Sequence, residues 1–452
     1  MLVERADRGG CCCCFRECEQ ADCLPEKLTI AGCLCLSGIR MTPLGMLGLV
    51  LVTGLAWFLG TDPLKLSMGR GVTSFNSEYV ELTPVKDFPR DTENKLQSAE
   101  IKWKGQFFGP ESLTFDAQGR GPYTGVSDGR VLRYDGPELG WSTFAYTSTN
   151  RSEVCAPKSP PGPNLPLEPV CGRPLGLRFH KPTGDLWIAD AYLGVMKVGP
   201  EGGQAEVVLD EIDGVRMKFT NDLDFDNEGN LFFTDSSKRW NRNQFILSLM
   251  EGEGTGRFIK YNLATKQTTV LLDGFRFPNG VAISKDFTFV VFTECRMGRM
   301  WRYWLKGPKA GTHELFADLP GWPDNVRRNE AGDFWVAIHC LRVKSAEILS
   351  SMPWLRTLLV RLPVPVKAVY GLLAGKPKGM ILRYGPSGEL KEVLEDQTGA
   401  VVKMVSEVEE HDGKLYLGSV LLPHVAVYTL PQAPVGNPDV DVTEETPAAA
   451  SG

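Results

Sequence analysis

The feature that most constrains the fold is a β-hairpin pattern that recurs along the chain. Its clearest copy covers residues 220–237, where Leu and Phe alternate with Asp in the first strand, as in a half-buried strand. The turn between the strands contains Gly229, since glycine adopts the positive φ of a tight turn at little steric cost. A hairpin returns to its starting end, so the polar residues Asn221 and Asp235 are expected to lie close together.

Six hairpins of this kind begin near residues 109, 173, 221, 277, 322 and 405. Each is followed by a second pair of short strands, so that four strands recur about every 45 to 80 residues, which is typical of propeller blades. We therefore predict an all-β fold over residues 101–430, a six-bladed β-propeller with four-stranded blades. The segment 101–108 is expected to complete the last blade and close the ring. A large β-sandwich or two separate β domains would not explain six aligned hairpin starts.

The 452 residues carry a net charge of -6, which argues against a nucleic-acid partner because such proteins usually present a basic surface. Eight of the twelve cysteines lie before residue 36, in a segment without readable periodicity. Residues 1–40 are therefore interpreted as a Cys-rich cytosolic tail, either S-palmitoylated near a membrane or without structural importance. Residues 431–452, rich in Pro, Ala and acids, are interpreted as a disordered tail.

The segment 41–61 contains no charged residue and is just long enough to cross a bilayer as one helix. It lies too far from the N-terminus for an ordinary signal peptide, so we predict a single transmembrane signal anchor. Residues 62–100 then form a polar stalk. The membrane is thus an expected partner of this chain.

Orientation is inferred from the only Asn-x-Ser/Thr sequon, at Asn150, which would accept a glycan in a lumenal segment. Cys155 and Cys171 follow it, and a disulfide between them would stabilise the fold by about 3 kcal/mol in the chain-entropy model. Sequons arise by chance and two cysteines need not pair. Together they favour a type II membrane protein whose propeller is lumenal or extracellular, at the plasma membrane or the endoplasmic reticulum.

The six hairpin starts of a propeller face one end of its central channel, called the mouth below. Oxygen-bearing side chains occupy equivalent points there: Glu111, Asn221, Asn279 and Asp324. Carboxylate and amide oxygens suit Ca²⁺, whereas Zn²⁺ would need His or Cys in tetrahedral spacing. The alternative is that these residues only begin strands by bonding their own backbone. Their recurrence in different repeats favours the cation.

Several motifs resemble the strictosidine synthase-like family: GPESL, CGRPLGL, ADAY, FTNDL, FFTDSS, RFPNGV, PDN and EHDGKLYLGS. The resemblance covers about residues 100–430, and the motifs occur in the family's order. Its wider relatives are paraoxonases and gluconolactonases, so it implies a six-bladed propeller with calcium at the mouth. Glu111, Asn221, Asn279 and Asp324 match the relatives' ligands, and the resemblance adds Asn325 as a weaker candidate.

The resemblance also bears on the reaction. Plant strictosidine synthases use a glutamate in the last blade, where this chain has Ser406, with Glu407 expected to point to the other face. Condensation of an amine with an aldehyde is therefore not expected. The animal relatives imply hydrolysis of aryl esters, which requires a general base. The paraoxonase histidine pair does not map onto this chain, and the candidate bases are His339, at the end of a mouth-facing strand, and Asp324.

The long insertion 341–378 leaves from the mouth and has a basic amphipathic pattern. It is expected to cap the site or touch the membrane, or else to pack on the propeller face. Two functions remain open. The first is a membrane-anchored, calcium-dependent hydrolase of lipophilic aryl esters or lactones. The second is a non-enzymatic receptor or scaffold that calcium stabilises.

Overall fold

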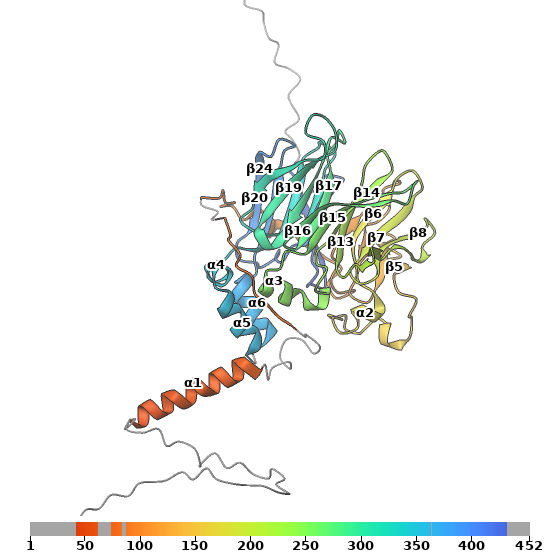
Figure 1. Ribbon diagram of the computed structural model, residues 1–452. Coiled ribbons are helices and arrows are strands. Elements are labelled where there is room, and N and C mark those ends of the chain that lie inside the picture. The colour runs from red at the N-terminus through yellow and green to blue at the C-terminus, as the bar shows by residue number, and fades with distance from the viewer. Residues whose placement is uncertain (1–41, 62–73, 84–86, 363, 432–452) are drawn as a thin grey trace, which may run out of the picture. The chain divides into compact units, whose positions relative to one another are not determined.

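The computed structural model describes residues 42–61, 74–83, 87–362 and 364–431 (Figure 1). The chain divides into two units, Met1–Gly60 and Thr61–Gly452. The predicted tails, 1–40 and from residue 432 onward, lie outside the described residues. In the first unit the predicted anchor contains a helix, α1 (Pro43–Thr61). No helix among the described residues is long and apolar enough to cross a membrane.

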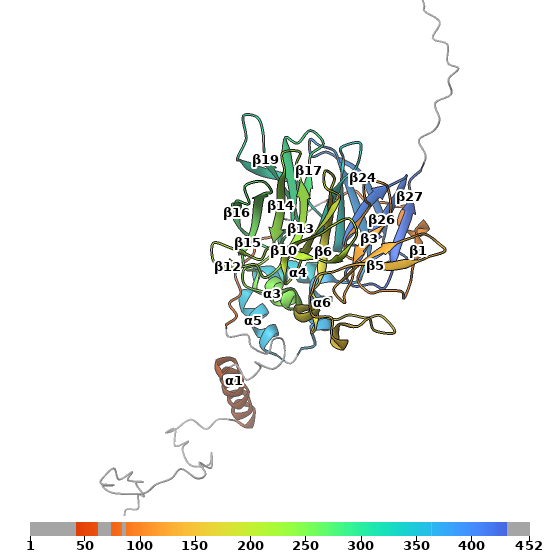
Figure 2. The ribbon, with the colours of Figure 1, turned by 90° about the vertical axis from the view of Figure 1, so that its right-hand side faces the viewer.

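The second unit contains six β-sheets arranged as the blades of a propeller, which confirms the predicted all-β fold (Figures 1 and 2). The first three blades, each given from the inner strand outward, are blade 1 with β2 (Leu113–Thr114), β3 (Tyr123–Gly125), β4 (Arg130–Tyr134), β5 (Trp141–Tyr146) and β9 (Gly203–Gln204); blade 2 with β6 (Pro174–His180), β7 (Asp185–Asp190), β8 (Gly194–Val198) and β10 (Glu206–Leu209); and blade 3 with β13 (Thr220–Phe225), β14 (Asn230–Asp235), β15 (Gly256–Asn262) and β16 (Thr268–Phe275).

The remaining blades follow the same order of strands. They are blade 4 with β17 (Pro278–Ile283), β18 (Phe289–Glu294), β19 (Arg299–Trp304) and β20 (His313–Asp318); blade 5 with β21 (Gly321–Arg328), β22 (Phe334–Leu341), β23 (Gly379–Tyr384) and β24 (Leu390–Asp396); and blade 6 with β25 (Glu407–His411), β26 (Lys414–Gly418), β27 (Val425–Thr429) and β1 (Glu100–Lys102). A separate two-stranded hairpin pairs β11 (Glu211–Ile212) with β12 (Val215–Arg216).

The ring closes where the N-terminal strand β1 joins the C-terminal strand β27. The two run antiparallel, with Ile101 opposite Ala426. The predicted closure between the two ends of the propeller is confirmed, although β1 is shorter than the expected segment 101–108. Pairing of β1 with β27 satisfies backbone groups that would otherwise be unpaired at the edge of blade 6, and it links the two ends of the propeller.

Hydrophobic side chains fill the space between each pair of neighbouring blades. Strand β14 shows how the sequence produces this arrangement. Leu231 and Phe233 pack towards blade 2, whereas Phe232, between them, packs towards blade 4. Because alternate residues of a strand point to opposite faces, a blade covered on both sides needs apolar residues at consecutive positions.

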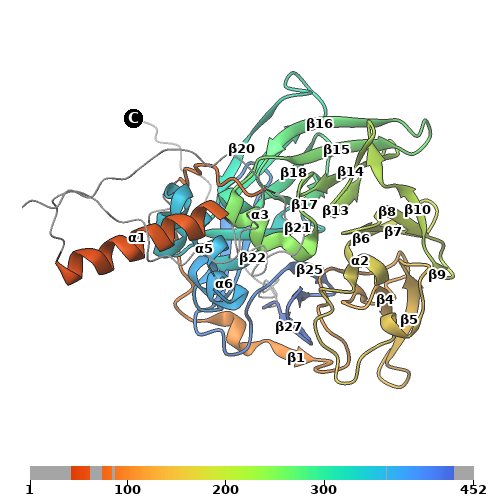
Figure 3. The same ribbon diagram turned by 60° about the horizontal axis from the view of Figure 1, so that its bottom comes forward.

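Helices gather at one end of the propeller (Figures 1 and 2). They are α2 (Glu168–Cys171), α3 (Phe245–Glu251), α4 (Lys344–Ser351), α5 (Pro353–Arg361) and α6 (Val366–Ala374), with 3₁₀ turns η1 (Lys95–Ser98), η2 (Glu153–Cys155), η3 (Arg242–Gln244) and η4 (Cys295–Met297). Viewed from this end, α3 and α6 lie in front of the inner strands (Figure 3). The insertion 341–378 thus contributes three of these helices.

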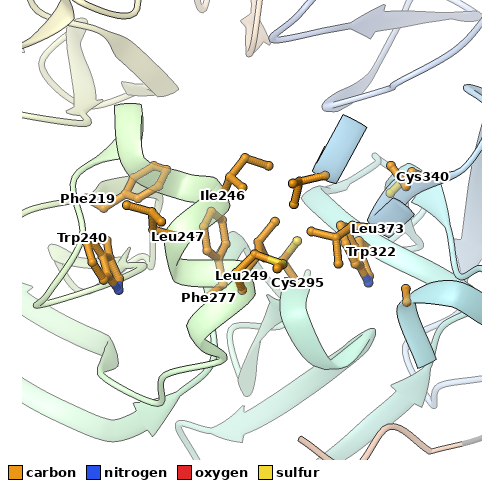
Figure 4. Close-up of a cluster of buried hydrophobic side chains, with 14 of the residues drawn as sticks. Phe219, Trp240, Ile246, Leu247, Leu249, Phe277, Cys295, Trp322, Cys340 and Leu373 are labelled. Atoms are coloured by element: carbon orange, nitrogen blue, oxygen red, sulfur yellow. The ribbon is translucent and has the colours of Figure 1, made fainter. Parts of the chain in front are cut away.

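A cluster of buried side chains joins this helical layer to the strand ends (Figure 4). Ile246, Leu247 and Leu249 of α3 pack with Phe219 and Phe277, which precede the inner strands of blades 3 and 4. The cluster also includes side chains of α4, α5 and α6. The insertion is therefore packed on the propeller face.

The described part of the predicted stalk lies against the propeller. Residues 74–83 cross the helical layer, where the Glu78 N–H donates to the Glu251 carbonyl at 2.8 Å and the Val80 N–H to the Ser350 carbonyl at 3.2 Å. Leu96 is fully buried between blades 5 and 6. Apolar residues among the polar ones of this segment supply contacts that a solvated stalk would lack.

The predicted disulfide between Cys155 and Cys171 is present. It closes a Pro-rich loop in which Leu165 and Glu168 line the cavity described below. Asn150, the predicted glycan acceptor, is exposed just before this loop. Glycosylation of Asn150 stays a prediction.

Candidate functional site

The inner strands of blades 2 to 5 share one irregularity near the mouth. In β13, Leu223 is three positions after Thr220, while their partners on β14, Phe233 and Asp235, are only two positions apart. The same extra residue occurs in β6, β17 and β21. A bulge of this kind re-aims side chains that strict alternation would send to opposite faces. The predicted ligands Asn221, Asn279, Asp324 and Asn325 all lie in these bulges.

Close packing of the bulges explains two glycines. A Cβ on Gly176 would lie 2.4 Å from Asp222 Oδ1 in the next blade. A Cβ on Gly280 would lie 2.6 Å from the Cα of Asn325. Neighbouring inner strands therefore approach so closely that these positions have no room for a side chain.

The predicted oxygen ligands converge on one cavity, which Glu111, Asn221, Asn279 and Asp324 all line. The amide nitrogens are already engaged: Asn221 donates to Ser236 Oγ at 2.9 Å, and Asn279 to Asp324 Oδ1 at 2.6 Å. Both amide oxygens and Glu111 Oε2 are buried and have no hydrogen-bond partner among the described residues. Buried acceptors of this kind are costly unless something outside the protein completes them.

The charges in the centre of the propeller also favour a cation. Asp222 and Glu407 are buried on either side of Arg327, whose guanidinium donates to Asp222 Oδ1 at 2.9 Å and to Glu407 Oε1 at 2.5 Å. Glu111 is buried beside this group, so its pKa is raised well above the usual value by burial and then by Asp324, Glu407 and Asp222. Carboxylates thus outnumber guanidinium groups in this network, and a divalent cation would correct the imbalance.

These observations fit Ca²⁺, which takes carboxylate and amide oxygens in flexible arrangements. No group of three or more His, Cys, Asp or Glu side chains among the described residues is arranged to hold a metal ion. The candidate donors include two amides, so they lie outside that type of cluster. Glu111, Asn221, Asn279 and Asp324 are the residues that would bind the ion.

Asn325 lies next to these donors and has a different environment. Its amide nitrogen donates to Glu111 Oε1 at 3.0 Å and to Glu407 Oε2 at 2.7 Å. It does not line the cavity, although its Oδ1 is buried without a hydrogen-bond partner in the described part of the chain. Its visible role is to hold the carboxylate of Glu111.

Glu407 points to the centre of the propeller, so the expectation that it faces the other side is wrong. Ser406 precedes strand β25, and regular alternation does not apply across the start of a strand. Its hydroxyl donates to the Glu111 carbonyl at 2.8 Å. Burial raises the pKa of Glu407 to about 7. Neither Ser406 nor Glu407 lines the cavity.

The two predicted catalytic residues are neighbours at the cavity. His339 Nδ1 lies 3.5 Å from Asp324 Oδ2, and the other ring nitrogen, Nε2, lies 2.8 Å from the hydroxyl of Tyr370. Tyr370 belongs to α6 and also lines the cavity. Burial raises the pKa of the Tyr370 hydroxyl, so this side chain stays a neutral phenol. The insertion therefore caps the site, as one of the predictions stated.

The cavity has a volume of about 110 Å³, and the rest of its wall is mainly apolar. Its wall includes Phe219, Phe245, Leu249, Phe277, Trp322 and Leu421. Helix α3 and the disulfide loop thus supply apolar surface opposite the oxygen donors. A ligand of this cavity would combine an apolar body with a polar group directed at the donors.

A buried ion pair in the cavity wall was not found from the sequence. Arg242 Nη1 donates to both oxygens of Glu168, at 2.7 and 2.6 Å, and the Tyr192 hydroxyl donates to Glu168 at 3.0 Å. The segment around Glu168 carries no repeat signal, because it belongs to a loop between blades. Asp235, at the end of the opening hairpin, also lies outside the cavity and bonds Arg257 at 2.6 Å.

A family profile described as strictosidine synthase matches residues 221–308, and one described as the N-terminal part of strictosidine synthase-like proteins matches residues 92–134. Strictosidine synthase-like protein 3 of Arabidopsis thaliana is 50% identical over 379 residues, which are 83% of this chain and 97% of that protein.

Two further proteins are similar. The adipocyte plasma membrane-associated protein of Gallus gallus is 35% identical over 341 residues, covering 74% of this chain and 78% of that protein. The structure of a gluconolactonase of Xanthomonas campestris aligns with a TM-score of 0.49 and 13% identity, covering 79% of this chain and 99% of that one. The extent and identity of the match to the Arabidopsis protein establish that this chain belongs to the strictosidine synthase-like family.

Proposed function

We propose that the chain is a calcium-dependent hydrolase of lipophilic aryl esters or lactones. The observation that carries the proposal is one apolar cavity whose polar end combines unpartnered oxygen donors with the His339–Asp324 pair. Ester hydrolysis needs polarisation of a carbonyl and a base that activates water. Both requirements meet in this cavity.

Glu111, Asn221, Asn279 and Asp324 would hold the calcium ion. When bound, calcium supplies Lewis acidity, which polarises an ester carbonyl and stabilises negative charge on its oxygen. The role of the four side chains is to hold their oxygens in place before the ion binds. Asn279 Nδ2 fixes the Asp324 carboxylate, and Asn325 fixes that of Glu111.

His339 is the proposed base. The proposed tautomer carries its hydrogen on Nε2 and donates it to the Tyr370 hydroxyl, which leaves Nδ1, 3.5 Å from Asp324 Oδ2, as the basic nitrogen. Nδ1 is buried and has no hydrogen-bond partner among the described residues, so its lone pair is not engaged by another group of the described chain. After it takes a proton, the imidazolium lies beside the Asp324 carboxylate, which stabilises the positive charge.

The apolar wall supports a lipophilic substrate. Phe245 and Leu249 of α3 and Phe219 and Phe277 of the strand ends would contact an aromatic leaving group. The cavity is not proposed to condense an amine with an aldehyde, because Ser406 occupies the place of the plant glutamate and lies outside the cavity.

The test compares hydrolysis of phenyl acetate, naphthyl acetate and an aromatic lactone by the full chain, with calcium and with a chelator. Glu111→Gln and Asn221→Ala are expected to abolish calcium-dependent turnover. The exposed residues Glu330 and Asn227, in turns at the far ends of their hairpins, supply matched controls as Glu330→Gln and Asn227→Ala. Unchanged hydrolysis by the two site variants, in folded protein, would falsify the metal-assisted mechanism.

The alternative is a non-enzymatic receptor or scaffold. Ser406 in the place of the plant glutamate favours it. Calcium binding by the full chain, measured by calorimetry and lost in Glu111→Gln, combined with no turnover of any ester or lactone tested, would select this second function.

We also propose that the segment 41–61, which contains α1, anchors the chain as a type II membrane protein. Support comes from the absence of charged residues in this segment and from the membrane association stated in the name of the Gallus gallus relative. In cells, the chain is expected to resist carbonate extraction, and Asn150→Gln is expected to remove a glycosidase-sensitive mass. Extraction into the carbonate supernatant would contradict the anchor, and an unchanged mass would contradict the orientation.

A further inference from the structure

Within the second unit, five exposed large hydrophobic side chains lie on the inserted helices or at the junction of α4 and α5. They are Ile348, Met352, Trp354, Val366 and Leu372. Trp354 is 65% exposed, which is unusual for a residue of this size. The buried faces of the same helices already pack on the propeller through Ala346, Leu349, Val369 and Leu373. The exposed apolar residues therefore form a second, outward surface that contacts among the described residues do not explain.

Other segments extend this surface at the same end of the propeller. Tyr79 lies on the strap formed by residues 74–83. The strap is hydrogen-bonded to α4, where the Ser350 carbonyl accepts from the strap main chain, and to α5, where the Arg356 guanidinium donates to it. Val154 and Val170 lie on the disulfide loop, and both are exposed. Helices α2 to α6 lie at one end of the propeller in both side views (Figures 1 and 2). We call this set, with the inserted helices, the mouth surface.

The insertion 341–378 is basic although the whole chain is acidic, whereas the strap exposes Glu78 and Glu81. The insertion 341–378 has seven Lys and Arg residues and one acidic residue, Glu347, in a chain with a net charge of -6. Lys344, Lys367 and Lys376 are exposed there. Exposed apolar side chains, a tryptophan among them, together with exposed lysines are the composition of protein segments that lie in the interface of a membrane.

We propose that the mouth surface docks on an anionic phospholipid bilayer. Charge complementarity selects this occupant, because exposed lysines attract anionic headgroups while Trp354 and its apolar neighbours enter the acyl boundary. The connection to the N-terminal segment agrees with it. Only the twelve residues 62–73 separate the uncharged segment 41–61 from Ser74 in the sequence.

Docking has a consequence for the cavity. Tyr370 of α6 and Phe245 and Leu249 of α3 line it, so the same helical layer both covers the cavity and forms the mouth surface. A lipophilic ligand would then enter from the bilayer without crossing water. The docking proposal itself rests on the exposed residues and not on hydrolase activity.

The experiment reconstitutes the full chain in vesicles of phosphatidylcholine and phosphatidylserine, with or without bromine on the acyl chains, which quenches nearby tryptophan fluorescence. Subtracting the spectrum of Trp354→Phe isolates the emission of Trp354. We expect this emission to fall at least about twofold in brominated vesicles. Both leaflets carry bromine, so the orientation of the protein does not affect the result.

Leu139 supplies a matched control, since it is 79% exposed in the turn between β4 and β5, at the opposite end of the propeller. In Leu139→Trp, bromine is expected to leave the emission of the introduced tryptophan unchanged. Lys344→Glu combined with Lys367→Glu is expected to reduce the quenching of Trp354 in vesicles that contain phosphatidylserine.

Equal emission of Trp354 in brominated and ordinary vesicles overturns the proposal, and so does equal quenching at Leu139→Trp. Turnover of phenyl acetate, which is soluble in water, is expected to be unchanged in Trp354→Phe. Failure of docking is therefore distinguished from failure of the proposed hydrolase.

Discussion

His339 Nε2 lies 2.8 Å from the hydroxyl of Tyr370, a residue on a helix inserted between two adjacent strands of the same blade. The contact joins a strand end at the mouth to the layer that covers it. It also determines which nitrogen of His339 faces the cavity. The insertion is thus part of the candidate site as well as a cover over it.

Tyr370→Phe is expected to lower kcat for aryl esters about fivefold, with a smaller change in KM. In the proposed tautomer the variant removes the acceptor of the His339 Nε2–H hydrogen bond, and one such bond contributes about 1 kcal/mol, a factor of about five in rate. Steady-state kinetics with phenyl acetate measure the effect. Tyr303→Phe, on β19 outside the cavity, is the control, and equal kinetics of the two variants would exclude the positioning role.

Calcium is expected to raise the melting temperature of the full chain, because it would neutralise the excess of buried carboxylates around Glu111. At 100 times its Kd, a ligand of the folded state stabilises by about 2.7 kcal/mol. Differential scanning calorimetry in calcium and in chelator measures the shift. Glu111→Gln is expected to lose the shift, while Glu330→Gln retains it; a melting temperature independent of calcium would contradict the site.

Arg327→Met is expected to destabilise the propeller by about 3–5 kcal/mol. Its guanidinium pairs with both Asp222 and Glu407, so the variant leaves two buried carboxylates without their counter-ion. Urea unfolding measures the loss. Arg328→Met, at the next position and only half-buried, is the control and is expected to cost much less. Equal stability of the two variants would show that the ion pairs contribute little.

Replacing both Cys155 and Cys171 with serine is expected to lower the free energy of unfolding by about 3 kcal/mol, the chain-entropy value for a loop of this size. The same loop carries Glu168, which the Arg242 guanidinium binds in the cavity wall. We therefore also expect the double substitution to raise KM more for bulky aryl esters than for phenyl acetate. A change in stability without this difference in KM would show that the disulfide stabilises the fold but does not shape the cavity.

Stability is expected to fall as the pH drops from about 4 to 2, partly because of Asp396. Burial opposes its ionisation, but hydrogen bonds from Thr398, Gln97 and the main chain of Val401 and Val402 outweigh burial and lower its pKa to about 2. A carboxylate with a depressed pKa stabilises the fold above its unfolded pKa and loses this effect as the pH falls towards its folded pKa. Urea unfolding at pH 4 and pH 2.5 measures the loss, which is expected to be smaller in Asp396→Asn.

Local patterns were enough to predict most of the architecture. The alternation and turn of residues 220–237 correspond to β13 and β14, and the repeats correspond to the six blades. The oxygen donors were found because Asn221, Asn279 and Asp324 occupy the same point of different repeats. These features depend on residues that are near one another in sequence, or on a pattern that recurs along the chain.

Other contacts arise only when the ring closes. Arg327 bridges Asp222, 105 residues away, and Glu407, 80 residues away, because the inner strands of three blades meet at the centre. The strap of residues 74–83 and the position of Tyr370 over His339 likewise depend on the packed helical layer. The sequence by itself thus determined the blades and their polar ends, since strand period and turn chemistry are local. The tertiary structure alone decided which side chains from distant blades and from the insertion share the cavity, since those pairings follow from closure and packing.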